Sequence, residues 1–223
     1  MSTGTRHTVT AFDDDMDEIR GLIAEMGARA ESAVMAAMKA LGEHDTELAA
    51  ATRAEDKVID TLETEVEKLV VRTIALRAPM ADDLRELIAA LKMSAVIERI
   101  GDYAKNIAKR VPQMEAKSSL AANEQLARMG DIVVEMIRTA MDAYAKRDID
   151  LARAVTARDD DVDQLNKDLF VDFVAYVAKN PKMATEVAHL LFTAKNLERI
   201  GDHTTTVAQM IYFTETGENL PDA

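Results

Sequence analysis

The strongest constraint on the fold is a six-residue acidic motif that the chain contains twice. IERIGD occupies residues 97–102, and LERIGD occupies residues 197–202. The segments before each motif also resemble one another, with a Met-Gly pair at 26–27 and again at 129–130. A repeat on this scale indicates duplication of a structural unit. The chain is therefore predicted to consist of two homologous halves with the same fold.

Composition and hydrophobic spacing predict that each half contains three long α-helices. Four prolines and eight glycines among 223 residues supply few turns, and the apolar residues recur at three- and four-residue steps. Asp45 and Asp148 are candidate N-caps for the second and fifth helices, and Asn180-Pro181 is the candidate start of the sixth. The other helices are expected over 12–42, 82–111 and 120–147, with the second helix ending near Leu76.

Short connections between long helices favour antiparallel neighbours, so each half is predicted to be an up-down-up bundle. The predicted fold class is all-α, with two tandem three-helix bundles at 12–112 and 120–216 that are related by internal duplication. Residues 1–11 and 217–223 are expected to be flexible tails.

The charge of the chain restricts its partners. Forty acidic and 27 basic residues give a formal net charge of −13, which repels nucleic acid and suits cations or basic protein surfaces. The chain has no cysteine, so any metal would be bound by carboxylates, histidines or backbone oxygens. It shows neither an apolar leader nor a run of about 18 apolar residues, and a cytoplasmic location is therefore expected.

Each hexapeptide places two carboxylates four residues apart, on one face of a helix. The second helix of each half carries another pair with this spacing. The acids are Asp56, Asp60, Glu98 and Asp102 in the first half, and Asp159, Asp163, Glu198 and Asp202 in the second. Such like charges destabilise a helix by roughly 0.2–0.5 kcal/mol unless a cation or basic side chain compensates. We predict all eight as metal ligands; structural or partner-binding acids are the alternative.

The glycines within the two motifs support a special role for these positions. A glycine inside a helix is about 1 kcal/mol less favourable than alanine, so its repetition at Gly101 and Gly201 indicates a close approach by another group. An acid pair without such a repeat, such as Glu63 and Glu67, is assigned to a solvated face.

Other residues near the motifs are given structural roles. Arg99 and Arg199 are expected to pair with the carboxylates, and His203 should point about 100° away from the adjacent Asp202. No Ser-His-Asp arrangement, GxxxxGK[ST] loop or GxGxxG motif is present, so no catalytic residue is predicted. Four methionines at equivalent core spacing are assigned to packing: Met26, Met38, Met129 and Met141.

The duplicated hexapeptides, the [DE]xxxD pairs on the preceding helices and the two Met-Gly pairs resemble the PhoU family of bacterial phosphate-transport regulators. The resemblance extends from about Phe12 to Thr216. It implies two three-helix bundles related by a pseudo-two-fold axis, with multinuclear iron or zinc clusters at the [DE]xxxD motifs of some members. All eight corresponding positions of this chain hold a carboxylate.

The same resemblance implies a non-enzymatic adaptor that restrains phosphate uptake and keeps the phosphate-starvation (Pho) response off when phosphate is plentiful. The implied partners are PstB, the ATPase subunit of the phosphate ABC transporter, and the sensor kinase PhoR. A homodimer is expected, with membrane contact only through partners. Two alternatives stay open: an accessory protein of a different phosphate carrier, and a carboxylate-bridged metalloenzyme, which would need inward-pointing carboxylates and a base near an open metal position.

Overall fold

The computed structural model describes the backbone of residues 4–115 and 124–220, and the side chains of residues 11–115 and 124–220. These residues form six α-helices and two short 3₁₀ helices, without a β-strand in the described ranges. The prediction of an all-α fold is therefore confirmed. The elements are α1 (Gly4–Glu43), α2 (Thr46–Arg77), α3 (Asp82–Ala108), η1 (Val111–Gln113), α4 (Glu124–Lys146), α5 (Ile149–Lys179), η2 (Pro181–Met183) and α6 (Ala184–Thr216).

The predicted caps of α2 and α5 are confirmed and are nearly identical. The Asp45 carboxylate accepts hydrogen bonds from the second and third backbone amides of α2 at 3.0 and 2.9 Å. The Asp148 carboxylate does the same for α5 at 2.9 and 3.1 Å. The residue before each cap, His44 or Arg147, has a positive φ of 51° or 53°, so the turn that precedes each cap has the same left-handed conformation in the two halves.

Several predicted boundaries are wrong. Helix α1 begins at Gly4, eight residues before its expected start, so residues 4–11 are helical. Helix α3 ends at Ala108, where the chain passes into η1 around Pro112, which has no backbone N–H to donate. Asn180 ends α5 instead of capping α6, because its backbone N–H bonds back to Tyr176 and Val177; Pro181 then begins η2. The expected start of α4 at residue 120 lies outside the described residues.

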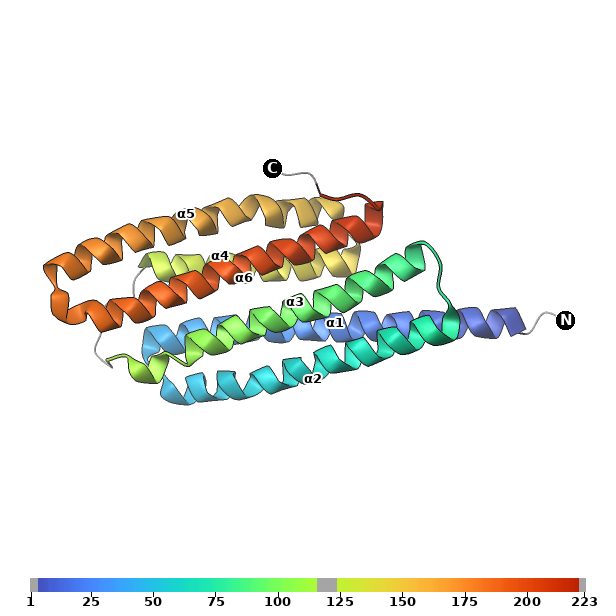
Figure 1. Cartoon of the computed structure of the whole chain (residues 1–223), viewed down its shortest axis with the longest axis horizontal. Helices are drawn as coiled ribbons and strands as arrows, with labels where there is room; N and C mark the ends of the chain where they lie inside the picture. Colours follow the sequence, from blue (N-terminus) through green and yellow to red (C-terminus); the bar gives the residue numbers. More distant parts are fainter. Residues whose placement is uncertain (1–3, 116–123, 221–223) are drawn as a thin grey trace.

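The two halves lie side by side with their helices along a common long axis (Figure 1). Within each half every helix contacts the other two: α1, α2 and α3 in the first, and α4, α5 and α6 in the second. The main contacts between the halves are α1 with α4 and α3 with α6. Helices α2 and α5 are therefore the outer helices, each packed mainly within its own half.

The Met-Gly pairs explain part of the contact between the halves. A Cβ added at Gly27 of α1 would overlap the Sδ and Cγ atoms of Met141 on α4, and one added at Gly130 would lie 3.1 Å from the Cγ and Cε atoms of Met38. Each glycine therefore makes room for a methionine of the other half. Met26 and Met129, beside these glycines, are fully buried. The assignment of the four methionines to packing is confirmed.

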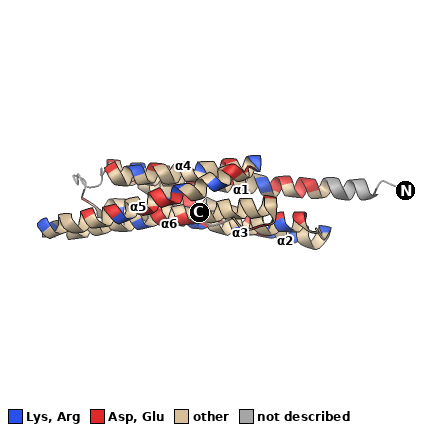
Figure 2. Ribbon diagram, turned by 90° about the horizontal axis from the view of Figure 1, so that it is seen from above, with Lys and Arg blue, Asp and Glu red and all other residues tan. Residues whose placement is uncertain are grey.

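Acidic residues are spread along the helices, as the view in Figure 2 shows for α1, α4, α5 and α6. Across the described residues, no helix carries an apolar stretch that is long enough to cross a membrane.

Candidate functional site

The acid pairs of each half meet between two neighbouring helices. We define acidic cluster 1 as Asp56, Asp60, Glu98 and Asp102, on α2 and α3, and acidic cluster 2 as Asp159, Asp163, Glu198 and Asp202, on α5 and α6. In each cluster the carboxylates of one helix lie close enough to those of the other to add to the rise that burial causes in the pKa of one member, Glu98 in acidic cluster 1 and Asp159 in acidic cluster 2. The helix faces predicted from the i, i+4 spacing are thus the faces that meet.

Lysine 105 supplies a positive charge inside acidic cluster 1. Its Nζ atom donates to Asp56 Oδ2 at 2.7 Å and to Asp102 Oδ1, and so joins α2 to α3. The Asp56 carboxylate is buried, with a residue exposure of 5%. Although burial opposes the charge of Lys105, its hydrogen bonds to Asp102 and Asp56 raise the pKa of the ammonium above its ordinary value. Part of the charge that a metal would neutralise is therefore already neutralised by the protein.

The remaining acids of acidic cluster 1 repel one another. Burial raises the pKa of Glu98 to about 7, with further contributions from Asp102, Glu63 and the α2 acids. Burial and the nearby Asp56 also raise the pKa of Asp60. Glu63 is half-buried, burial raises its pKa, and it lies close enough to raise the pKa of Glu98. The assignment to a solvated face therefore fits the exposed Glu67 but not Glu63.

Acidic cluster 2 lacks the internal ammonium. Thr205 occupies the position that corresponds to Lys105 in the repeat, and its buried Oγ1 has no hydrogen-bond partner among the described residues. Lys195 donates to Glu198 Oε1 at 2.5 Å, but the buried Oε2 of Glu198 also lacks a partner there. Burial, followed by the nearby Asp202 and Asp163, raises the pKa of Asp159 to about 6. Lys167 lies 3.6 Å from Asp163, so each of the two lysines reaches a single acid. Acidic cluster 2 therefore lacks a cation that bridges its two helices, as Lys105 bridges α2 and α3.

The motif glycines allow the close approach that their repetition predicts. A Cβ at Gly101 would lie 2.8 Å from Ile59 Cδ1, so Gly101 lets α2 pack against α3. A Cβ at Gly201 would lie 2.9 Å from Asp159 Oδ1 and 3.5 Å from Val162 Cγ1. The glycine thus has a packing role in both halves, and in the second half it also makes room for a cluster carboxylate.

The expected pairing of the motif arginines with the acids is wrong within the described residues. Arg199 lies over the Tyr103 ring, with its Cζ 5.8 Å from the ring centroid, and neither Arg99 nor Arg199 forms an ion pair in the described part of the chain. The Tyr103 and His203 rings meet edge to face across the α3–α6 contact, at a centroid distance of 5.4 Å. His203 therefore lies against Tyr103, and burial lowers its pKa.

The side chains as placed do not enclose a metal. Within the described ranges, no group of three or more Asp, Glu or His side chains is arranged so that it could hold an ion. Metal binding at the eight predicted positions therefore stays a prediction.

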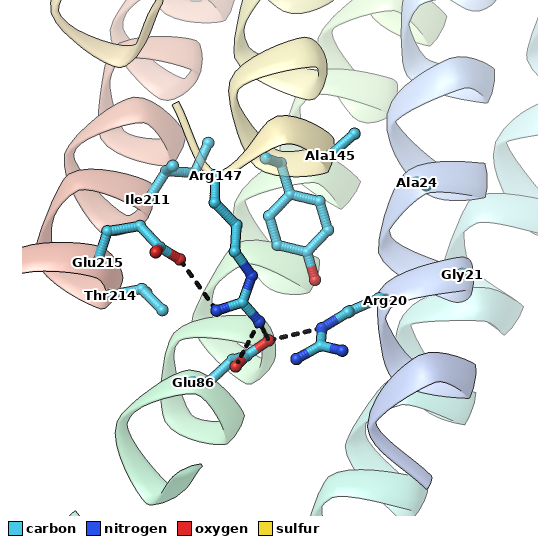
Figure 3. Close-up of a pocket in the computed structure, with 10 residues that line it drawn as sticks. Arg20, Gly21, Ala24, Glu86, Ala145, Arg147, Ile211, Thr214 and Glu215 are labelled. Atoms are coloured by element: carbon cyan, nitrogen blue, oxygen red, sulfur yellow. Dashed lines mark hydrogen bonds and ion pairs between the residues drawn. The ribbon is translucent and has the colours of Figure 1, made fainter. Parts of the chain in front are cut away.

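A separate polar pocket that the sequence analysis did not predict lies where α1, α3, α4 and α6 meet (Figure 3). Its volume is about 390 Å³. Glu86 accepts from Arg20 Nε at 2.7 Å and from Arg147 at 3.0 Å, and Arg147 also lies 3.5 Å from Glu215. The two arginines and two glutamates balance, so the pocket has no net charge to select an ion. No sequence motif marks these residues because they come from three helices and the turn after α4.

Comparisons with known proteins place this architecture among phosphate-transport proteins. The PhoU domain family matches residues 23–111 and 126–211, one domain in each half. A "Phosphate-specific transport system accessory protein PhoU homolog" from Zymomonas mobilis is 47% identical over 97% of this chain and 91% of its own length. A protein of the same description from Caulobacter vibrioides is 42% identical over 97% of this chain and 94% of its own length.

Solved structures agree with the sequence relatives. The crystal structure of PhoU from Pseudomonas aeruginosa aligns over its whole length with 93% of this chain, with a TM-score of 0.86 and 31% identity. The phosphate transport system regulatory protein PhoU from Streptococcus pneumoniae has a TM-score of 0.87 at 25% identity, over 94% of this chain and 99% of that protein. The arrangement of two duplicated bundles is therefore shared with both structures.

Proposed function

This chain belongs to the PhoU family, and we propose that it acts as a regulatory adaptor that restrains phosphate uptake and the phosphate-starvation response. It is a phosphate-transport accessory protein, as its relatives are described, and no enzymatic activity is proposed for it. The observation that carries the proposal is the family match in both halves, together with 47% identity over nearly the whole chain.

The proposed partners are PstB, the ATPase subunit of the transporter, and the sensor kinase PhoR. Rigid helices of 23 to 40 residues offer long faces for protein contacts, and a net charge of −13 suits basic partner surfaces. In this proposal the protein acts in the cytoplasm and reaches the membrane only through its partners. The predicted homodimer is compatible with these roles but is not needed for them.

A reporter of the phosphate-starvation response tests this function. In phosphate-rich medium, deletion of the protein is expected to raise alkaline phosphatase activity, and the intact gene is expected to restore repression. Transport measurements in strains that lack the ATP-driven carrier separate this proposal from an accessory role on a different phosphate carrier. Low reporter activity in the deletion strain would contradict the proposed repression.

The metal prediction fits the two acidic clusters unequally. In acidic cluster 1 a metal would compete with the Lys105 ammonium, which already bridges Asp56 and Asp102. Acidic cluster 2 has no bridging lysine: the exposed Lys167 and Lys195 each pair with one acid, and the buried Oε2 of Glu198 is without a partner among the described residues. We therefore propose that a cation binds first at acidic cluster 2.

Oxygen donors alone suit a ferric or hard divalent ion better than zinc, which more often takes nitrogen and sulfur ligands. Such an ion would supply positive charge that neutralises the carboxylates.

Metal analysis of the purified protein after loading with Fe³⁺ or Mn²⁺ tests this order. The Asp159→Asn, Asp202→Asn double variant is expected to lose the tighter site, whereas Asp56→Asn, Asp102→Asn should keep it. Lys105→Thr, which places the residue of the second half in the first, should strengthen binding at acidic cluster 1. Equal loss of metal in the two double variants would contradict the proposed preference. Reporter assays of the same variants then show whether repression needs the metal.

A further inference from the structure

The second half carries an exposed apolar groove between α5 and α6, about one helical turn from Asp163 and Glu198 of acidic cluster 2. We define the α5–α6 groove by Phe170, Val171, Leu191, Phe192, Lys167 and Lys195, and its volume is about 680 Å³. Phe170, Val171 and Phe192 have exposures of 58%, 64% and 55%. Large apolar side chains gathered on a surface in this way mark interaction sites more often than isolated ones do.

The internal repeat shows that the fold does not require these apolar residues. In the first half, Glu67, Lys68 and Lys92 occupy the positions that correspond to Phe170, Val171 and Phe192. Those charged residues are all exposed, on helices that pack together in the same way. The buried neighbours Val70 and Phe173 also correspond, and both are apolar. The two halves therefore share their core and differ in this surface, so the apolar groove serves a purpose other than folding.

The charged side chains that line the α5–α6 groove are positive, in contrast to the chain as a whole and to acidic cluster 2 beside the groove. The side chains that line it include two lysines and no acid, whereas the net charge of the chain is −13. The guanidinium of Arg110 adds a further positive charge and lies 4.3 Å from the centroid of the Phe192 ring. Lys167 and Lys195 pair with Asp163 at 3.6 Å and with Glu198 at 2.5 Å, but they are 68% and 51% exposed, and ion pairs this exposed exchange readily for a partner's carboxylates. Arg110 forms no ion pair among the described residues, so its charge is open to a partner. This combination favours an apolar ligand that also carries carboxylates.

We propose that the α5–α6 groove binds an amphipathic α-helix of a partner protein, with apolar residues on one side and acidic residues along its edges. A groove between two helices accepts a third helix through apolar side chains spaced at i, i+3, i+4 and i+7. A second copy of the chain bound through the same face would bring the lysines of two grooves together, which argues against a symmetric dimer here. Binding at this groove is independent of whether the chain represses phosphate uptake.

A designed peptide tests the proposal. The probe is a fluorescently labelled helix of about 18 residues, or five turns, with leucine on one face and glutamate elsewhere. Fluorescence anisotropy should show that it binds the full chain, and that a peptide with lysine in place of each glutamate binds roughly tenfold more weakly or not at all. Failure of the glutamate peptide to bind, or equal binding of the two peptides, would overturn the proposal.

The repeat supplies the matched variants. The triple variant Phe170→Glu, Val171→Lys, Phe192→Lys places the first-half residues in the second half and makes the net charge one unit more positive. It should weaken binding of the glutamate peptide by roughly tenfold or more, because apolar anchors dominate such interfaces. The control Glu67→Gln, Lys68→Gln, Lys92→Gln alters the equivalent surface of the first half and should bind normally. Circular dichroism checks that each variant is folded.

Other occupants give different results. If the intact protein sediments as a dimer that the triple variant abolishes, the groove is occupied by a second copy and the proposal is wrong. If the intact protein binds vesicles of anionic phospholipid and the triple variant does not, the ligand is a membrane surface and the proposal is again wrong. Unchanged peptide binding by the triple variant would place the peptide elsewhere on the molecule and overturn the assignment of the groove.

Discussion

The ammonium group of Lys105 lies 2.7 Å from the buried carboxylate of Asp56 and ties α3 to α2. The corresponding acid of the second half, Asp159, has no ammonium partner in the described part of the chain, because Thr205 replaces the lysine. Lys105→Thr should lower the free energy of unfolding by about 1–3 kcal/mol, less than for a fully buried pair because the lysine is partly exposed. Urea denaturation measures this change.

The reciprocal substitution in the second half serves as the control for Lys105→Thr. Thr205→Lys introduces an ammonium beside acidic cluster 2 and should raise stability or leave it unchanged. An unaltered urea midpoint in Lys105→Thr would mean that the bridge contributes nothing measurable.

The raised pKa of Glu98 predicts how stability depends on pH. Its pKa is about 7 in the folded protein, against 4.5 for an ordinary glutamate. As the pH rises from 4.5 to 7, the unfolded chain releases this proton first, so the folded state binds more protons and loses stability. The contribution of Glu98 to the free energy of unfolding is therefore fully present below pH 4.5 and is lost as the pH rises through about 7. Denaturation midpoints measured between pH 5 and 8 should therefore fall less in Glu98→Gln than in the parent.

An acid outside the clusters supplies the comparison for Glu98. Glu65 is an exposed residue of α2, and Glu65→Gln should leave the pH dependence of the parent unchanged. Parallel curves for the parent and Glu98→Gln would refute the role of Glu98.

The fit of Met141 against Gly27 predicts opposite effects for two glycine substitutions in α1. Gly21→Ala should stabilise the protein by about 0.5–1 kcal/mol, because no atom lies within 4 Å of the added Cβ and alanine favours helix. Gly27→Ala should destabilise it by about 1–3 kcal/mol, because the new methyl group overlaps the Met141 side chain. Thermal denaturation distinguishes the two variants.

Removal of the overlapping side chain checks the cause. Met141→Ala leaves a cavity by itself, but in combination with Gly27→Ala it should show a favourable coupling free energy. Additive effects of the two substitutions would exclude the proposed overlap.

Glu86 on α3 links α1 to the turn after α4, and its substitution should lower the free energy of unfolding. Its carboxylate is only 15% exposed and accepts from Arg20 on α1 and from Arg147 after α4. Glu86→Gln removes the charge from these hydrogen bonds and should destabilise the protein by about 1–3 kcal/mol. Asp17→Asn is the matched control: Asp17 pairs with the same Arg20 but is 75% exposed, so its loss should change stability by less than about 0.5 kcal/mol. Similar effects in the two variants would show that burial of Glu86 does not matter.

Much of the fold could be predicted because its signals are local. The repeat of the hexapeptide, the three- and four-residue apolar spacing, and the caps at Asp45 and Asp148 each depend on residues within a few turns of one another. The same local geometry predicts that Glu98 and Asp102 share a helix face. The cap expected at Asn180 is wrong because a 3₁₀ turn starting at Pro181 separates it from α6.

Helix periodicity and the internal repeat are enough to predict the six-helix, duplicated fold and the positions of the paired carboxylates, since they set which residues share a face. What those faces meet depends on how the six helices pack. This packing brings Glu63 towards acidic cluster 1, sets Met141 against Gly27, and places the Arg199 guanidinium over Tyr103 instead of on the acids. The reason is physical: a helix fixes the direction of its own side chains, but their neighbours depend on how separate helices pack, and no local pattern records that packing.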